Sequence, residues 1–391
     1  MNKNAVAIRH TQNFRPARHS KSYGKIKSFI ENNAVLCIAV TAAILSSLFV
    51  KPDAEYINYL DFKTLSCLFS TLAVICALRN IHFFSTLAEK IVVCTGNLRV
   101  AVTAIVYITF IGSMLIANDM ALLTFLPLGF YVMKMTGMDK YTAYVFILQN
   151  IAANLGGMLT PFGNPQNLYL FEAFKIPSGE FVGIMLIPFS VSVLMITVCS
   201  LLLPASRLSL TASRNERLPA VKTMLYIILF ALSILAVFRV VPYYICMGII
   251  IAVLMIIDRS ALRAVDYPLL LTFTAFFIFA GNMARIDIIH DILSALMEKS
   301  TLLYSVLSCQ VISNVPSAIL LSQFTDNYPS LLIGVNIGGT GTLIASLASL
   351  ITFREYTKEH KDKTARYLVL FTVMNFIFLS VLVAVSLMLG Y

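Results

Sequence analysis

The segment Asn154–Asn167, which reads NLGGMLTPFGNPQN, interrupts a long apolar run with glycine, proline and polar side chains. A second interruption, Asn336–Ser349, reads NIGGTGTLIASLAS and begins 182 residues later. The polar and glycine positions of the two segments then align: Asn154 with Asn336, Gly156-Gly157 with Gly338-Gly339, Thr160 with Thr342, Asn164 with Ser346, and Asn167 with Ser349. This match indicates an internal repeat, in which each copy contains a helix that is broken in its middle.

Of the 391 residues, 59% are apolar and only 12% are charged, whereas soluble domains carry roughly 25% charged residues. The charges are bunched, and long uncharged runs lie between them. This composition predicts an all-α polytopic membrane protein surrounded by a lipid bilayer. The net charge of +10 then reports the cytoplasmic loops of such a protein and gives no reason to expect a nucleic-acid partner.

A spanning helix needs about 20 apolar residues. Segments that can span, including the two broken helices, lie near 34–50, 60–78, 142–171, 181–204, 222–238, 242–257, 267–283, 330–353 and 367–390. Two further apolar segments, 100–133 and 301–325, are too long for one helix and too short for two spanning helices with a loop. Each is therefore predicted to be a re-entrant helical hairpin. Its polar tip, Asn118-Asp119 or Ser313-Asn314, must be buried in protein or face water.

Each hairpin follows an amphipathic, charge-bearing segment, Arg79–Arg99 or Arg285–Lys299, and precedes a broken helix. We expect a basic cytoplasmic tail at 1–33, a first repeat at 34–204, a cytoplasmic linker at 205–221 and a second repeat at 222–391. With the N-terminus in the cytoplasm, 23 of the 29 lysines and arginines fall on cytoplasmic segments. The C-terminus is then external and the two repeats are inverted, which is typical of secondary transporters in the cell membrane.

Other functional classes lack their sequence signatures. The seven cysteines form no C-x-x-C pair and the five histidines are scattered, so we expect neither a disulfide framework nor a metal centre. The glycine-rich stretch Gly334–Thr342 lacks the lysine of an ATP-binding loop. The spans contain no nucleophile–base pair, so we expect no enzymatic activity. A channel is the remaining alternative to a transporter.

Unwound backbone in mid-membrane leaves carbonyl and amide groups without helical partners, at a cost of several kcal/mol each unless another group binds them. Freed carbonyls, with Asn, Ser and Thr oxygens, can coordinate sodium, and the N-termini of half-helices favour an anion. Pro161, Pro165 and Pro316 are expected to end helices at this depth. The alternative for the paired glycines is close helix packing. Packing alone does not predict the same polar set twice, each time after a hairpin.

Asp119 is the one charged residue near the middle of a predicted membrane segment. A carboxylate at that depth costs roughly 2.5–3.5 kcal/mol, so we expect Asp119 to be protonated, paired or bound to a cation. The structural alternative is a neutral Asp119 that caps the second arm of the hairpin. Val315 occupies the corresponding position of the second hairpin, so the two tips are not equivalent.

Residues 60–390 resemble the ion transporter superfamily, which includes divalent anion/sodium symporters, citrate transporters, arsenite permeases and related sodium/proton antiporters. The resemblance rests on Asn118-Asp119, Asn154-Leu155-Gly156-Gly157, Gly163-Asn164-Pro165-Gln166-Asn167, Ser313-Asn314-Val315-Pro316 and Gly338-Gly339-Thr340-Gly341-Thr342. It implies a homodimer whose protomers each have a scaffold domain and a moving transport domain, with elevator-type alternating access. Ala117-Asn118-Asp119 departs from the Ser-Asn-Thr tips of the carboxylate symporters and is more similar to the arsenite permeases.

The resemblance also implies the site residues. The substrate, a small anionic or neutral oxyacid, is expected between the tips, at Asn118, Asn164, Pro165, Gln166, Asn167, Ser313, Asn314, Ser317 and Ser346. The coupling ion, sodium or a proton with no other cofactor, is expected at Asp119, Asn118, Asn154, Gly156, Thr160, Gly163, Asn314, Asn336, Gly338, Thr340 and Thr342. The leading hypothesis is cation-coupled transport of a citrate-like carboxylate or an inorganic oxyanion. Its alternatives are export of arsenite or antimonite, and sodium/proton antiport with Asp119 as the exchanging carboxylate.

Overall fold

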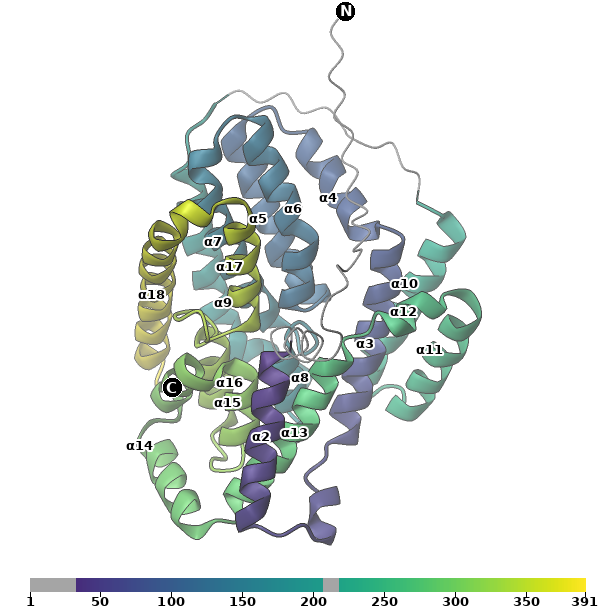
Figure 1. The fold of residues 1–391 in the computed structure, drawn as a ribbon, viewed down its shortest axis with the longest axis vertical. Coiled ribbons are helices and arrows are strands. Elements are labelled where there is room, and N and C mark those ends of the chain that lie inside the picture. Colours follow the sequence, from purple (N-terminus) through teal and green to yellow (C-terminus); the bar gives the residue numbers. More distant parts are fainter. Residues whose placement is uncertain (1–32, 207–217) are drawn as a thin grey trace, which may run out of the picture.

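A computed structural model of the protein describes residues 33–206 and 218–391, which form helices and no strand (Figure 1). The prediction of an all-α polytopic membrane protein is confirmed. Except for Asn33, the predicted basic tail lies outside the described residues, as does most of the predicted linker at 205–221. Within the described part, six segments are long and apolar enough to cross a membrane: Ala54–Asn80, Leu98–Leu115, Ser178–Leu201, Ala220–Val237, Tyr267–Ala284 and Lys361–Met388.

The helices follow the apolar runs of the sequence. The first half contains α2 (Ala34–Phe49), η1 (Ala54–Ile57), α3 (Phe62–Asn80), α4 (Phe83–Val93), α5 (Leu98–Leu115), α6 (Asn118–Met135), η2 (Asp139–Tyr141), α7 (Thr142–Gly156), η3 (Gly157–Leu159), α8 (Pro165–Ala173) and α9 (Ser178–Leu201). The second half contains α10 (Ala220–Val237), α11 (Tyr243–Ile257), α12 (Arg259–Arg263), α13 (Tyr267–Ala284), α14 (Asp287–Ile312), α15 (Asn314–Leu321), α16 (Tyr328–Ile337), α17 (Leu347–Glu359), η4 (Lys361–Lys363) and α18 (Thr364–Met388).

Helical hairpins occur where the sequence predicts them. α5 and α6 form the first, and the part of α14 after its non-helical residue Ser300 forms the second with α15. Both turns are made in the same way, because Ala117 and Ser313 adopt positive φ angles of 48° and 75° directly before an asparagine. The side-chain Oδ1 of each asparagine then accepts a hydrogen bond from the next backbone N–H, at 3.0 Å for Asn118 and 2.9 Å for Asn314.

The hairpins differ in length. At roughly 1.5 Å per residue, the arms of the second hairpin are about 18 Å and 12 Å long, whereas α5 and α6 are each about 27 Å long. The hydrocarbon core of a bilayer is about 30 Å thick. The arms of the second hairpin are therefore too short to cross it, in line with a re-entrant hairpin. In the first hairpin, α5 is by itself long and apolar enough to cross, but the tip of this hairpin meets a break in the middle of a longer helix, as described below.

The helices pack in two groups. In the first group, α2 packs against α13, and α3 packs against α10, α11 and α12. The second group contains both hairpins and both broken helices: α5 and α6 pack against α7, α14 and α15 against α16, and α17 against α6 and α7. The two groups are in contact, because α13 also packs against α15 and α3 against α8. In Figure 1, α5 and α6 lie in the upper half of the molecule and α14 and α15 in the lower half. The two hairpins thus lie in opposite halves of the molecule.

A buried ion pair joins the two groups at the end of the molecule predicted to be external. Glu172, near the end of α8, has a side chain only 3% exposed, and its Oε2 lies 2.6 Å from Lys63 Nζ and 3.2 Å from Arg239 Nε. Lys63 belongs to α3, and Arg239 follows α10. Arg239 also donates a hydrogen bond from Nη2 to the Phe171 carbonyl oxygen at 2.5 Å. These two cations, among the few on the predicted external side, therefore hold α8 against the first group.

Asp53 and Arg285 form a second ion pair at this end, with Asp53 Oδ2 at 2.7 Å from Arg285 Nη2. The hydrogen bond from Arg285 holds the pKa of Asp53 below its usual value. A carboxyl group with a lowered pKa in the folded state stabilises the protein above about pH 3.9, and this contribution is lost as the pH falls through the lowered pKa.

We expect Asp53→Asn to lower the melting temperature at neutral pH, and the difference from the wild type to shrink below about pH 4. Melting temperatures of both proteins between pH 7 and pH 3 measure it. Asp326→Asn is the matched control, because Asp326 is exposed and has no ion pair among the described residues. A difference that stays constant over this range would contradict the account of the pair.

Candidate functional site

The first broken helix opens at a pair of glycines and closes at a proline. α7 ends at Gly156, η3 follows, and α8 begins at Pro165, which occupies the first helical position, where a missing N–H costs nothing. Three of the carbonyl oxygens freed between the two helices accept hydrogen bonds from one side chain. Asn167 Nδ2 donates hydrogen bonds to those of Gly157, Met158 and Thr160, at 3.1, 3.3 and 3.3 Å. The break is thus shorter than the interruption Asn154–Asn167 in the sequence, since Pro165, Gln166 and Asn167 are helical.

The second broken helix is closed by a residue of the hairpin. α16 ends at Ile337, and α17 begins at Leu347 with Ser346 as its N-cap, whose Oγ accepts from Ser349 N–H at 3.2 Å. Between them, the carbonyl oxygens of Gly338 and Thr340 accept hydrogen bonds from Gln310 Nε2 at 2.9 and 3.2 Å. Gln310 lies on α14, just before the hairpin tip.

Both hairpins dock onto their broken helices through equivalent contacts. Thr160 Oγ1 donates to the Met114 carbonyl oxygen at 2.8 Å, and Thr342 Oγ1 donates to that of Gln310 at 3.1 Å. Thr160 and Thr342 are 182 residues apart, whereas Met114 and Gln310 are 196 apart, as are the hairpin tips. The repeat visible in the sequence therefore corresponds to a repeat of atomic contacts.

Gly156 and Gly338 allow this close approach. A Cβ at Gly156 would lie 2.2 Å from the Phe110 carbonyl oxygen and 2.5 Å from Ser113 Oγ, and one at Gly338 would lie 2.9 Å from Cys309 Sγ. Ser113 and Cys309 are equivalent positions on the two hairpins. Close helix packing, which was the alternative explanation of the paired glycines, therefore accounts for Gly156 and Gly338. This does not conflict with a role of the same positions in ion binding.

We expect Gly156→Ala to destabilise the protein by about 1–3 kcal/mol, because the methyl group would meet backbone that cannot move aside. Gly248→Ala is the control, since Gly248 lies within α11 with no atom near its Cβ position. That change is expected to be neutral or to stabilise by up to about 1 kcal/mol. Thermal unfolding in detergent compares the two. Equal stability of Gly156→Ala and the wild type would show that the hairpin does not dock as described.

Buried asparagines connect the first hairpin tip to both breaks. Asn118 Nδ2 donates to Asn154 Oδ1 at 3.2 Å, and Asn154 Nδ2 donates in turn to Asn150 Oδ1 at 3.4 Å. Asn164 Nδ2 donates to Asn336 Oδ1 at 3.3 Å, and Asn336 Nδ2 to Asn167 Oδ1 at 2.6 Å. The two breaks are therefore joined directly, across the boundary between the repeats.

Gly339 lies at the meeting point of this network. A Cβ at Gly339 would lie 3.1 Å from Asn314 Nδ2 and 3.8 Å from Asn154 Oδ1. The second hairpin tip is also anchored to the second break, because Asn314 N–H donates to the Ala345 carbonyl oxygen at 3.0 Å. Residues from both tips and both breaks thus come together, as the aligned motifs predict.

Four helices begin at this point: α6 at Asn118, α8 at Pro165, α15 at Asn314 and α17 at Leu347. The N-terminus of a helix carries a partial positive charge and unpaired N–H groups, which favour an anion. Asp119 lies in the first turn of α6, and its buried Oδ1 has no hydrogen-bond partner among the described residues. The site therefore combines a positive set of helix termini with one carboxyl group.

The contacts given for the other predicted site residues lie within their own hairpin or break. Ser317 Oγ donates to the Ser313 carbonyl oxygen at 2.7 Å and lies 2.8 Å from Ser308 Oγ. Gln166 is buried, and its Oε1 has no partner within the described residues. Gly163 packs tightly, because a Cβ there would lie 2.5 Å from the Gly157 carbonyl oxygen. Thr340 Oγ1 donates to the Ile337 carbonyl oxygen at 2.5 Å and so points back into its own helix.

Sequence reasoning missed Gln310 and Asn150. Asn150 Nδ2 donates to Ser349 Oγ at 3.2 Å and so links the first broken helix to the second. Asn150 lies one helical turn before Asn154, a spacing that could have identified it. Gln310 is a polar residue in an apolar hairpin arm, but its repeat partner is Met114, so no comparison of the halves could have revealed its contacts.

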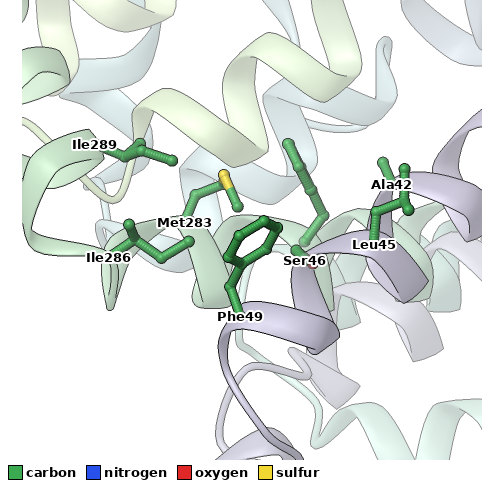
Figure 2. Close-up of a pocket in the computed structure, with 8 residues that line it drawn as sticks. Ala42, Leu45, Ser46, Phe49, Met283, Ile286 and Ile289 are labelled. Atoms are coloured by element: carbon green, nitrogen blue, oxygen red, sulfur yellow. The ribbon is translucent and has the colours of Figure 1, made fainter.

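A surface groove lies apart from this site. It has a volume of about 330 Å³ and is lined by Ala42, Leu45, Ser46, Phe49, Phe279, Met283, Ile286 and Ile289. Figure 2 shows α2 residues such as Phe49 facing Met283 and Ile286 across it. None of the predicted site residues lines the groove, and its one polar side chain is that of Ser46. It offers nothing to hold an anion.

Comparison with known proteins agrees with this geometry. The sequence profile of the citrate transporter family matches residues 30–333. The chain is 31% identical to an uncharacterized transporter of Methanocaldococcus jannaschii over 361 residues, which cover 92% of this chain and 98% of the relative. It is 27% identical to the inner membrane protein YbiR of Escherichia coli over 303 residues, 75% of this chain and 80% of that protein. The chain belongs to the citrate transporter family and is a membrane transport protein, with no indication of an enzyme.

Proposed function

We propose that this protein is a secondary active transporter that moves a small anion, either a citrate-like carboxylate or an inorganic oxyanion, across the cell membrane. The observation that carries the proposal is the meeting of four helix N-termini around buried asparagines from both hairpin tips and both breaks. The substrate would bind between Asn118 and Asn314. Helix dipoles and amide N–H groups would hold it, because the described contacts among the tip and break residues include no lysine or arginine. The guanidinium of Arg79 contacts the first hairpin one residue after Asp119, with Nη1 at 3.3 Å from Met120 Sδ.

Asp119 is the proposed coupling group. An ionised Asp119 beside an anion would repel it, so substrate binding requires a proton or a sodium ion at this carboxyl group. Binding of the cation and of the anion are then linked, and each raises the affinity for the other by the same factor. This linkage is what gradient-driven transport requires.

The two packing groups suggest how access could alternate. The group with both hairpins and both broken helices would move as the transport domain against the α2, α3 and α10–α13 group, in an elevator-type cycle. We propose a homodimer, with the N-terminus in the cytoplasm and the C-terminus outside. Chemical labelling of intact cells that carry Asp139→Cys or Asp326→Cys tests this orientation, because both positions are exposed and only the cysteine of Asp326→Cys should react from outside.

A thermal-shift screen of the purified protein tests the substrate class. A ligand at 100 times its dissociation constant adds about 2.7 kcal/mol of stability, so a transported carboxylate or oxyanion should raise the melting temperature. The rise should grow at lower pH or with added sodium, depending on which cation is coupled. If no carboxylate or oxyanion shifts the melting temperature at any pH or sodium concentration, the proposed substrate class is wrong.

Sodium/proton antiport is the second candidate, and the unpartnered Oδ1 of Asp119 favours it. In this case Asp119 would exchange a proton for sodium, and no anion would be needed. The same screen separates the two candidates, since an antiporter would respond to sodium and pH and to no anion. Sodium flux into vesicles that carry a pH gradient would then be the decisive measurement.

A further inference from the structure

The side chain of Gln310 fills the interior of the second break. Its Nε2 donates to the Gly338 and Thr340 carbonyl oxygens, and its Oε1 accepts from Thr342 N–H at 2.9 Å. Gly341 has a φ angle of +125°, and a Cβ there would lie 2.2 Å from Gln310 Oε1. The loop therefore wraps closely around the amide, and only glycine fits at its tightest point.

The first break is closed by an amide too, but from a different position. The carbonyl oxygens of Met158 and Thr340 are equivalent in the repeat, and each accepts from a side-chain amide, of Asn167 and Gln310 respectively. In the first half this amide comes from the helix after the break, and in the second half from the hairpin arm before it. Ser349, the repeat partner of Asn167, bonds instead to Ser346 and Asn150.

These contacts bear on where a cation can bind. Carbonyl oxygens released by an unwound helix bind a cation through the lone pairs that also accept hydrogen bonds. A cation could reach the Gly338 and Thr340 oxygens only if the Gln310 amide left them. The amide would then keep just one of its three present acceptors, the Val306 carbonyl oxygen at 3.2 Å. In the first half, by contrast, the hairpin tip retains a carboxyl group, Asp119, whose Oδ1 has no partner among the described residues.

We infer that Gln310 takes the permanent place of a coupling cation in the second half, so that the protein binds a single exchangeable cation or proton, at Asp119. The inference rests on the proposed function, because it concerns the number of coupling ions. It predicts that cation binding depends on Asp119 alone, and that a negative charge at position 310 creates a new cation site. Gln310→Glu is the test, since the shape is kept and a carboxylate then faces the two carbonyl oxygens.

The experiment measures the melting temperature of the full chain in detergent at pH 8.5, in sodium chloride and in choline chloride of equal concentration. In Asp119→Asn, the two salts should give the same melting temperature. In Asp119→Asn combined with Gln310→Glu, sodium should raise it by about 2 °C or more. The control combines Asp119→Asn with Gln323→Glu, a change at an exposed glutamine outside the break, and should show no sodium effect.

Two results would overturn the inference. One is a sodium-dependent rise in the melting temperature of Asp119→Asn with Gln310 intact. A cation would then bind without a carboxylate at position 119 or at position 310. This measurement decides the matter even if the Gln310→Glu protein fails to fold. The other is a folded double variant that sodium does not stabilise. Because the readout is cation binding, absence of anion transport would count against the proposed function and leave this result unchanged.

Discussion

Replacing Asp119 with asparagine is expected to reduce gradient-driven uptake to the background of empty vesicles while the protein remains folded. Asparagine keeps the shape of the side chain but carries no charge and binds no proton, so the anion would lose its coupled cation. A carboxylate at this depth costs roughly 2.5–3.5 kcal/mol. The stability of the variant is therefore expected to equal or exceed that of the wild type, by up to about 2 kcal/mol.

The control is Asp139→Asn, the same change at an exposed acid beside α7. It should leave both uptake and stability unchanged, because surface substitutions usually alter stability by less than about 0.5 kcal/mol. Uptake of labelled substrate and thermal unfolding of the same preparations give the two readouts. Undiminished gradient-driven uptake by Asp119→Asn would remove Asp119 from the coupling mechanism.

The double change Lys63→Met and Arg239→Met is expected to destabilise the protein by about 3 kcal/mol. It leaves the carboxylate of Glu172, whose side chain is 3% exposed, without a cation. Breaking a buried ion pair from one side typically costs about 3–5 kcal/mol. We expect the lower value because the side chains of Lys63 and Arg239 are themselves 31% and 30% exposed.

Adding Glu172→Gln to that double variant should restore much of the lost stability, because the buried charge is then gone. Thermal unfolding of the double and triple variants measures this difference. The rescue separates loss of the ion pair from loss of the hydrogen bond that Arg239 donates to the Phe171 carbonyl oxygen, which Glu172→Gln does not replace. A double variant as stable as the wild type would contradict the role of Glu172 in joining α8 to the first group.

The membrane helices and the two helix breaks could be predicted from the sequence, because composition and internal repetition indicate them. Long apolar runs identified the membrane helices, and the alignment of Asn154 with Asn336 and Thr160 with Thr342 identified two breaks that meet hairpins in the same way. Glycine, proline and polar residues inside an apolar run are informative because they predict an unwound helix. The backbone N–H and C=O groups of an unwound helix in a membrane must find specific hydrogen-bond or ion partners.

Partners of single side chains could not be predicted in the same way. Gln310 closes the second break and Asn167 the first, although neither has an amide at its repeat position. The pairing of Glu172 with Lys63 and Arg239 joins residues far apart in the sequence, and it depends on how the two helix groups pack. Pro165 was expected to end a helix, but it begins α8, because proline also suits the first turn of a helix.

The most direct test of the account is uptake of labelled citrate, succinate or arsenate into proteoliposomes under an imposed sodium or proton gradient. The account predicts that at least one of these anions accumulates above its external concentration, and that an ionophore which collapses the gradient abolishes the accumulation. If no anion enters under either gradient, or if it only equilibrates at the same rate with and without the gradient, the protein is not a cation-coupled anion transporter.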